Sequence, residues 1–260
     1  MKKNSFIKLL LTILITTLFF GNAYSSSKNL LIIDWSFAGI TGKFERDSLQ
    51  RGYQVYKEVC SSCHSMKYVS YRNLFEPGGP EFTEDQAKAI AASFELTDGP
   101  NEDGEMFIRP AKLSDKFVMP FANIKAAQAA NGGAYPPDMS VLAKARSGGV
   151  DYIYSLLLGY EDPPSGVTLE DGVYYNKYIY GINIKMAKPL SDGLIEYNDG
   201  TVASKEQMAK DVTTFLMWTA EPHLEARHKM GFKAILYLII LTILVYFSMK
   251  KIWSRIESEV

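Results

Sequence analysis

Two strongly apolar segments lie at the two ends of the chain. Near the start, Lys2 and Lys3 precede an apolar run over residues 7–20 that only Lys8 interrupts, and residues 21–25 are mostly small. This order of basic, apolar and small residues is typical of a cleaved export signal. We therefore predict a signal peptide over residues 1–25, which is removed when the rest of the chain leaves the cytoplasm; the alternative is an uncleaved N-terminal anchor.

The second apolar segment predicts a transmembrane helix near the C-terminus. Residues 234–249 carry no charge, and together with 231–233 they approach the ~20 residues that cross a bilayer. Lys250, Lys251 and Arg255 follow, and such cations favour the cytoplasmic side. The sequence thus predicts an exported domain over 26–230, an anchor over 231–249 and a cytoplasmic tail over 250–260. We expect a single-pass protein of a bacterial inner membrane, with its domain in the periplasm.

Helix-capping patterns divide the exported domain into short helices. Thr83 and Ser204 are each followed three residues later by glutamine, as in a capping box. We expect one helix from Thr83 to about Phe94 and another from Ser204 towards Pro222. Three further helices are predicted, from Asp47 to about Val59, from Asp138 to Arg146 and from Asp151 to Leu158. Residues 95–120 and 159–200 are predicted to form long ordered loops, with a small hairpin.

Composition and charge exclude several classes of protein. The chain has 260 residues, of which 47% are hydrophobic, and this is typical of a globular protein. Its net charge of -1 gives no basic excess for binding nucleic acid. Residues 76–105 hold nine acids and one base, which suggests either a surface for a basic partner or a solvated loop. With two cysteines, the chain is no disulfide scaffold.

Both cysteines belong to one motif, Cys60, Cys63 and His64 in the pattern C-x-x-C-H. This is the attachment sequence for c-type haem, in which two thiols add to the haem vinyl groups and the adjacent imidazole binds the iron. A thioredoxin-like motif would follow a strand, whereas a helix is predicted here. A zinc site would need a second pair of ligands, and a disulfide across two residues would be strained. We therefore predict one covalently bound haem c.

The second axial ligand is not fixed by the motif. A methionine thioether would suit electron transfer, whereas an open position would suit ligand binding or catalysis. Four methionines lie in or beside predicted loops, and composition cannot choose among them: Met106, Met119, Met139 and Met186. His223 and His228 are a further possibility, although both lie near the predicted anchor.

Several longer stretches resemble cytochrome c1, the haem subunit of ubiquinol–cytochrome c oxidoreductase (the bc1 complex). The stretches cover most of residues 28–255 and are far more specific than the haem motif. They are CSSCHSMKYVSYR at 60–72, DGPNEDGEMFIRPAKLSD at 98–115, ANGGAYPPDMS at 130–140, residues 145–160, YYNKYIYGINIKMAKPLSDG at 174–193, AKDVTTFLMWTAEP at 209–222 and the anchor.

The resemblance implies roles for individual residues. It implies that Met186 is the distal iron ligand and that Arg146 lies at a haem propionate, where a guanidinium suits a carboxylate. It also implies haem contacts for Tyr152, Asn131, Pro136 and Pro137. One departure concerns residues 179–181, where the family commonly has Phe-Pro-Gly and this chain reads IYG.

The fold implied is mainly α, a class I cytochrome c-like core with long loop insertions and one C-terminal transmembrane helix. The function implied is a membrane-anchored relay that takes one electron from the Rieske iron–sulfur protein and passes it to a soluble or anchored cytochrome c. Cytochrome b would lie beside the anchor, and no independent catalytic site is expected. Alternatives are a stand-alone anchored c-type cytochrome feeding a terminal oxidase or peroxidase, and a haem enzyme with an open sixth position.

Overall fold

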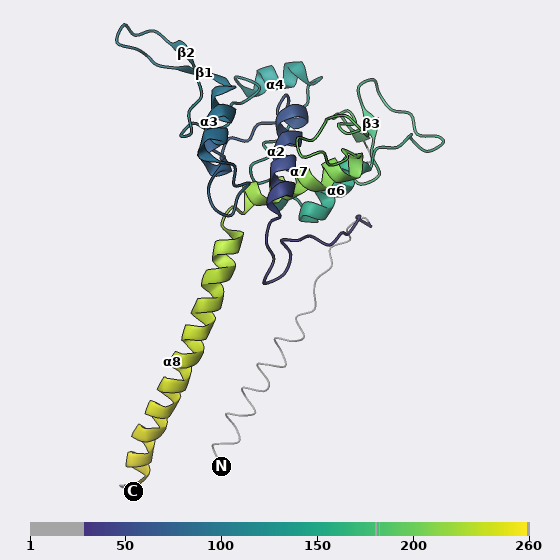
Figure 1. Cartoon of the computed structure of the whole chain (residues 1–260). Helices are drawn as coiled ribbons and strands as arrows, with labels where there is room; N and C mark the ends of the chain where they lie inside the picture. The colour runs from purple at the N-terminus through teal and green to yellow at the C-terminus, as the bar shows by residue number, and fades with distance from the viewer. Residues whose placement is uncertain (1–28, 180, 182, 259–260) are drawn as a thin grey trace.

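Helices form most of the ordered structure (Figure 1). The computed structural model describes residues 29–179, 181 and 183–258, so the predicted signal peptide lies outside the described residues. The α-helices are α2 (Arg46–Val55), α3 (Glu84–Ala92), α4 (Ile124–Ala130), α5 (Leu142–Ala145), α6 (Gly149–Leu158), α7 (Lys205–Ala220) and α8 (Leu224–Ser258). A π-helical turn (Tyr56–Cys60) continues α2, and a 3-10 turn covers Tyr71–Leu74.

The strands form two small antiparallel hairpins. β1 (Glu95–Asp98) pairs with β2 (Phe107–Pro110), and β3 (Tyr174–Tyr175) pairs with β4 (Asn183–Ile184). Each hairpin lies in one of the two long loop regions expected from the sequence. The structure therefore confirms the mainly α fold with loop insertions and one long apolar helix at the C-terminus.

The helix starts predicted from capping patterns are correct where a local hydrogen bond caps the helix. The Thr83 hydroxyl accepts from the Gln86 amide at 3.2 Å, and the Gln86 side chain accepts from the Thr83 amide at 2.8 Å, so α3 has the predicted capping box. Ser204 likewise caps α7 by accepting from the Gln207 amide. The prediction that Asp47 begins α2 is wrong, because the helix starts at Arg46 and Asp47 lies in its first turn.

Two other aspartates bind across the fold instead of capping the helices predicted for them. Asp138 does not cap α5, which begins after Val141. Its carboxylate instead accepts from the Ser65 hydroxyl and from the backbone amides of Lys67 and Ser140. Asp151 lies inside the first turn of α6 and accepts from the Trp35 indole at 2.7 Å. α4, which the sequence analysis missed, is capped by Asn123.

The core is centred on the crossing of α2 and α7. The backbones approach so closely at Gly52 that a Cβ there would lie 2.1 Å from the Asp211 carbonyl oxygen. Tyr53 stacks edge-on against Phe117 and Phe215, so aromatic rings fill the space beside the crossing. This packing fixes the direction in which α2 delivers the haem motif that follows it.

One buried carboxylate cross-links the two helices. Asp211 of α7 is fully buried and accepts from the Ser48 hydroxyl at 2.7 Å and from the Arg51 guanidinium at 2.8 and 3.2 Å. Gln207 donates a further hydrogen bond at 2.9 Å. Arg51 also pairs with Asp199, whose side chain is partly exposed. Because a buried charge is costly unless it is paired, this network is a strong link between α2 and α7.

α8 projects away from the globular part as one long helix (Figure 1). Among the described helices, it alone is long and apolar enough to cross a membrane, and none of its most apolar window is buried against the other described residues. Its first turns are fastened to the domain. Glu225 accepts from the Arg46 guanidinium at 2.9 and 3.0 Å and from the Phe44 amide at 3.0 Å. The His228 imidazole lies 3.3 Å from the Gly42 carbonyl.

Some acids of the acidic stretch over residues 76–105 form ion pairs within the domain. Glu81 pairs with Arg46, Glu84 with Lys88, and Asp98 with Arg109. Three exposed acids instead lie in the turn that joins β1 to β2, which stands out from the domain in Figure 1. We call them the tip acids: Glu102, Asp103 and Glu105. None of them forms an ion pair with another described residue, so their charge is available to a partner.

Candidate haem site

A cavity of about 590 Å³ lies beside the haem motif, within the size range of ligand pockets. Its walls come from the end of the π-helical turn, from α6 and α7, and from the loops on either side of β4. Eight of the nine predicted site residues line it: Cys60, His64, Asn131, Pro136, Pro137, Arg146, Tyr152 and Met186. The ninth, Cys63, lies in the tight turn between Cys60 and His64 but is not among the lining residues.

The motif residues are presented by a compact turn. The amides of Cys63 and His64 both donate to the Cys60 carbonyl, at 3.2 and 2.9 Å. Both cysteines are half-buried free thiols. The turn therefore holds two thiols and one imidazole in a fixed order at the edge of the cavity.

His64 is held with one ring nitrogen already bonded. Its Nδ1 lies 2.8 Å from the Pro137 carbonyl oxygen, which can only accept, so Nδ1 carries the proton and donates. The residue is 9% exposed, and burial lowers the pKa of the imidazole against the opposing effects of the Pro137 carbonyl and the Asp138 carboxylate. A neutral ring with a proton on Nδ1 leaves the lone pair of Nε2 free to bind a metal.

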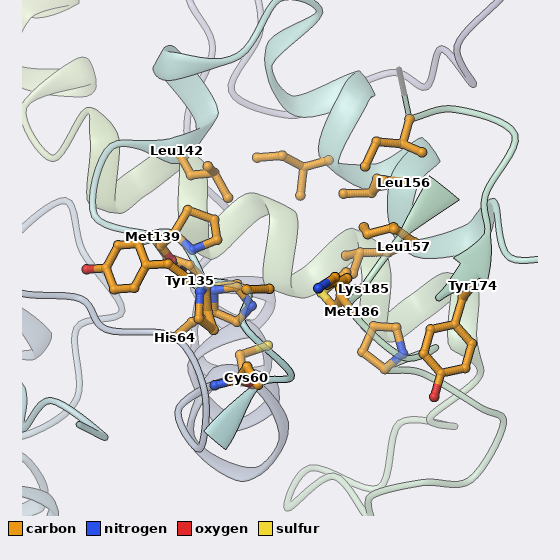
Figure 2. A pocket seen from close by; sticks show the side chains of 18 of the residues that line it. Cys60, His64, Tyr135, Met139, Leu142, Leu156, Leu157, Tyr174, Lys185 and Met186 are labelled. Carbon is orange, nitrogen blue, oxygen red and sulfur yellow. Dashed lines mark hydrogen bonds between the residues drawn. The ribbon is translucent and has the colours of Figure 1, made fainter. Parts of the chain in front are cut away.

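Met186 lies on the far side of the cavity. Figure 2 shows His64 and Cys60 on one side and Met186 and Lys185 on the other. The Tyr160 hydroxyl donates to the Met186 carbonyl at 3.0 Å. The Lys185 ammonium donates to the Gly132 carbonyl at 2.8 Å. The segment around Met186 is thus fastened to two other parts of the chain, of which Gly132 lines the cavity.

The other methionines of the loops are placed differently. Met106 and Met119 are 61% and 52% exposed and do not line the cavity. Met139 is buried and lines the cavity, but Figure 2 shows it on the same side as His64. His223, directly before α8, and His228, in its first turns, do not line the cavity either.

The remaining predicted contacts differ in what their side chains do. Arg146 is exposed at the end of α5, and its guanidinium bonds the Ala145 carbonyl at 3.2 Å without pairing with any acid that the structure describes. The Asn131 amide donates to the Ala127 carbonyl at 2.7 Å, so this side chain also ends α4. Tyr152 lines the cavity from the first turn of α6.

Comparison with known proteins decides the family. The model of the Cytochrome C1 family matches residues 35–256. The chain belongs to the cytochrome c1 family. It is 47% identical over 240 residues to "Cytochrome c1" of Rhodospirillum rubrum, covering 86% of this chain and 87% of that protein. It is 49% identical over 225 residues to "Cytochrome c1-2, heme protein, mitochondrial" of Solanum tuberosum, covering 86% and 85%.

A further relative is longer than this chain. "Cytochrome b/c1" of Bradyrhizobium diazoefficiens is 51% identical over 239 residues, which cover 85% of this chain but only 35% of that protein. Membership in the cytochrome c1 family places the chain in respiratory electron transport, with a bound haem, and α8 is long and apolar enough to serve as a transmembrane anchor.

The cavity fits the haem of a cytochrome c1. The Cys60 thiol and the His64 imidazole lie on one side, with Cys63 in the adjacent turn. The Met186 thioether lies on the other side, and the Arg146 guanidinium, without an acidic partner in the described structure, lies at the wall. The sides are apolar, and the sequence analysis did not single out their residues: Leu142, Ile153, Leu156, Leu157, Val212 and Leu216. The apolar run in α6 could have indicated the first part of this wall. Tyr160 and Lys185 gave no local signal, because their partners lie 26 and 53 residues away.

Proposed function

We propose that Cys60 and Cys63 attach one haem c covalently and that His64 and Met186 are its axial ligands. The observation that carries the proposal is the placement of His64 and Met186 on opposite sides of one apolar cavity, with the Cys60 thiol at its edge (Figure 2). The bound haem iron would carry one electron at a time. The chain's own residues hold the group, exclude water from its faces and set its potential.

The bond between His64 and the Pro137 carbonyl supports the proximal assignment. It keeps the proton on Nδ1 and fixes the ring, so that Nε2 is the atom available to iron. The carboxylate of Asp138 fastens the segments on both sides of this contact by accepting from Ser65 and Lys67. His64 therefore needs little rearrangement to act as a ligand.

The position of Met186 supports the distal assignment. His64 and Met186 would hold the haem iron from the two sides of the cavity, whereas Met139, the other loop methionine in the cavity, lies on the same side as His64. Iron held by both side chains would suit electron transfer and would leave no position for substrate. Arg146 would pair with a haem propionate, while Tyr152, Asn131, Pro136 and Pro137 would pack along the haem.

We further propose that the electron comes from the Rieske iron–sulfur protein and leaves to a soluble or anchored c-type cytochrome. Cytochrome b would lie beside α8. The relative named "Cytochrome b/c1" supports this neighbour, since this chain matches only about a third of its length. The domain would lie on the periplasmic side of a bacterial inner membrane. In that arrangement residues 1–25 form the export signal, 231–249 the single span and 250–260 the cytoplasmic tail.

Purification of the full-length chain from membranes in mild detergent tests this function. We expect c-type haem that remains on the chain in a denaturing gel, and a b-type cytochrome that co-purifies. Quinol added to this preparation should reduce the c-type haem, and removal of the Rieske protein should stop the reduction. A chain that purifies without a b-type cytochrome would instead support the stand-alone anchored cytochrome. Carbon monoxide binding to the reduced protein would contradict the axial role of Met186.

A further inference from the structure

The segment that carries Met186 has little local structure to hold it. β4 ends at Ile184, and the next core residue along the chain is Leu190, which is buried. Met186 itself is half-buried, and Ala187 and Lys188 are exposed. No proline stiffens residues 179–181 on the approach to this segment. The direction of the Met186 thioether must therefore depend on contacts with other parts of the chain.

The first such contact comes from the end of α6. The Tyr160 hydroxyl donates to the Met186 carbonyl at 3.0 Å. Tyr160 forms a β-bridge with Asn176, which is fully buried and donates from its side chain to the Leu156 carbonyl at 2.8 Å. A Cβ at Gly159 would lie 2.6 Å from the Asn176 side-chain oxygen, so these segments are in close contact. The donor is thus carried by a tightly packed part of the fold.

The second contact crosses to the loop that leads to Pro137. The Lys185 ammonium donates to the Gly132 carbonyl at 2.8 Å. Gly132 and Gly133 have φ values of 57° and 84°, a left-handed conformation that favours glycine. The Gly133 amide donates to the Gln128 carbonyl at 2.8 Å, which fastens this turn to the end of α4. Lys185 therefore joins the loop carrying Met186 to the loop whose Pro137 carbonyl accepts from His64.

We propose that Tyr160 and Lys185 are positioning residues that together keep the Met186 thioether directed into the cavity. The inference rests on the proposed haem site. Tyr160 holds the backbone of Met186 itself, and Lys185 holds the residue before it, so the two bonds restrain the segment from different walls. Loss of either bond should favour an arrangement in which Met186 has left the iron. One hydrogen bond corresponds to a factor of about 5 in such an equilibrium.

Competition by imidazole for the oxidised haem measures how readily Met186 is displaced. The haem-loaded full-length protein in detergent is titrated with imidazole, and loss of the methionine–iron charge-transfer absorption is followed. We expect Tyr160→Phe and Lys185→Leu each to lower the half-saturating imidazole concentration about fivefold, and the double variant to lower it further. Lys185→Arg keeps a donor and should restore most of the wild-type value.

Matched controls separate positioning from general damage. Lys188→Leu removes an exposed lysine of the same loop, and Tyr175→Phe removes a hydroxyl from β3; neither side chain hydrogen-bonds a described residue in the structure, and both variants should titrate as wild type. Unchanged imidazole titration in both Tyr160→Phe and Lys185→Leu would overturn the proposal. If the wild-type protein lacked the charge-transfer absorption, the ligand assignment of Met186 would fail first. Melting temperatures, followed by far-UV circular dichroism, identify any variant that is merely unfolded.

Discussion

Removal of the charge on Asp211 should strongly destabilise the protein, although this residue does not line the cavity. Asp211→Asn keeps the shape of the side chain but replaces one oxygen with an amide that can only donate. In the native structure Arg51, Ser48 and Gln207 all donate to this carboxylate. The asparagine would place its own donor against theirs and leave the Arg51 charge without its buried partner.

The size of the effect follows from burial. Asp211 is fully buried, and breaking a buried ion pair by removing one partner costs about 3–5 kcal/mol. We expect the lower end, about 3 kcal/mol, because Arg51 keeps its bond to Asp199. For a domain of this size, such a loss lowers the melting temperature by roughly 6–12 °C.

The matched control is Asp199→Asn, which removes the other acid bound to Arg51. The Asp199 side chain is 41% exposed, and exposed pairs contribute only about 0.2–1 kcal/mol. The assay is thermal unfolding of the haem-loaded, full-length protein in detergent, followed by far-UV circular dichroism. Equal melting temperatures for the two variants would refute the argument that the α2–α7 link depends on a buried carboxylate.

Four further outcomes are expected. The Cys60→Ala/Cys63→Ala double variant should hold haem that dissociates on a denaturing gel stained for peroxidase activity, because both thioether bonds are lost, whereas the Cys60→Ala single variant should keep haem on the gel through Cys63; haem that stays on the double variant in the gel would contradict this. Met186→Leu should abolish the methionine–iron charge-transfer absorption and lower the reduction potential, measured by redox titration, whereas Met119→Leu should change neither. Deletion of residues 231–260 should release a soluble, haem-loaded domain from membranes, and its retention after carbonate washing would indicate a second anchor. Neutralising the tip acids should flatten the salt dependence of electron transfer to a basic cytochrome, measured by stopped flow, since surface charges act on encounter over ~8 Å at physiological salt.

Features that depend on neighbouring residues could be predicted from the sequence. The box at Thr83 and the cap at Ser204 are local bonds over three residues, and the structure contains both, although the Gln207 side chain bonds Asp211 and does not complete a box at Ser204. Asp138 shows where such reasoning fails. Its pattern resembles a cap, but the carboxylate is used by Ser65 and Lys67 about 70 residues away. Asp138 could cap a helix or bind the distant residues, and in the structure it binds the distant residues. The sequence pattern contains no information about that tertiary contact.

In the cavity, too, the sequence predicts local features but not the contacts between distant segments. The C-x-x-C-H pattern and the resemblance pointed to residues of which all but Cys63 line one cavity. The bonds that arrange those residues, His64 to Pro137 and Lys185 to Gly132, join segments 73 and 53 residues apart. Such contacts depend on how the loops pack, and no periodicity or capping rule encodes them. The short α4 was missed for a different reason, because its cap, Asn123, is followed by seven residues with little amphipathic pattern.

The π-helical turn at Tyr56–Cys60 sets the rotational phase of the haem motif. Gly52, one turn earlier, must face α7, where the two backbones almost touch. In an α-helix each residue turns the side-chain direction by about 100°. In an unbroken α-helix, the direction of Cys60 would therefore be fixed by the direction in which Gly52 faces α7. The wider π-helical turn takes up one additional residue. Gly52 can therefore face α7 while Cys60 points in the direction that the cavity needs. Removing a single residue between Tyr56 and Cys60 should therefore turn Cys60 and the His64 imidazole by about 100° relative to the crossing, away from the cavity.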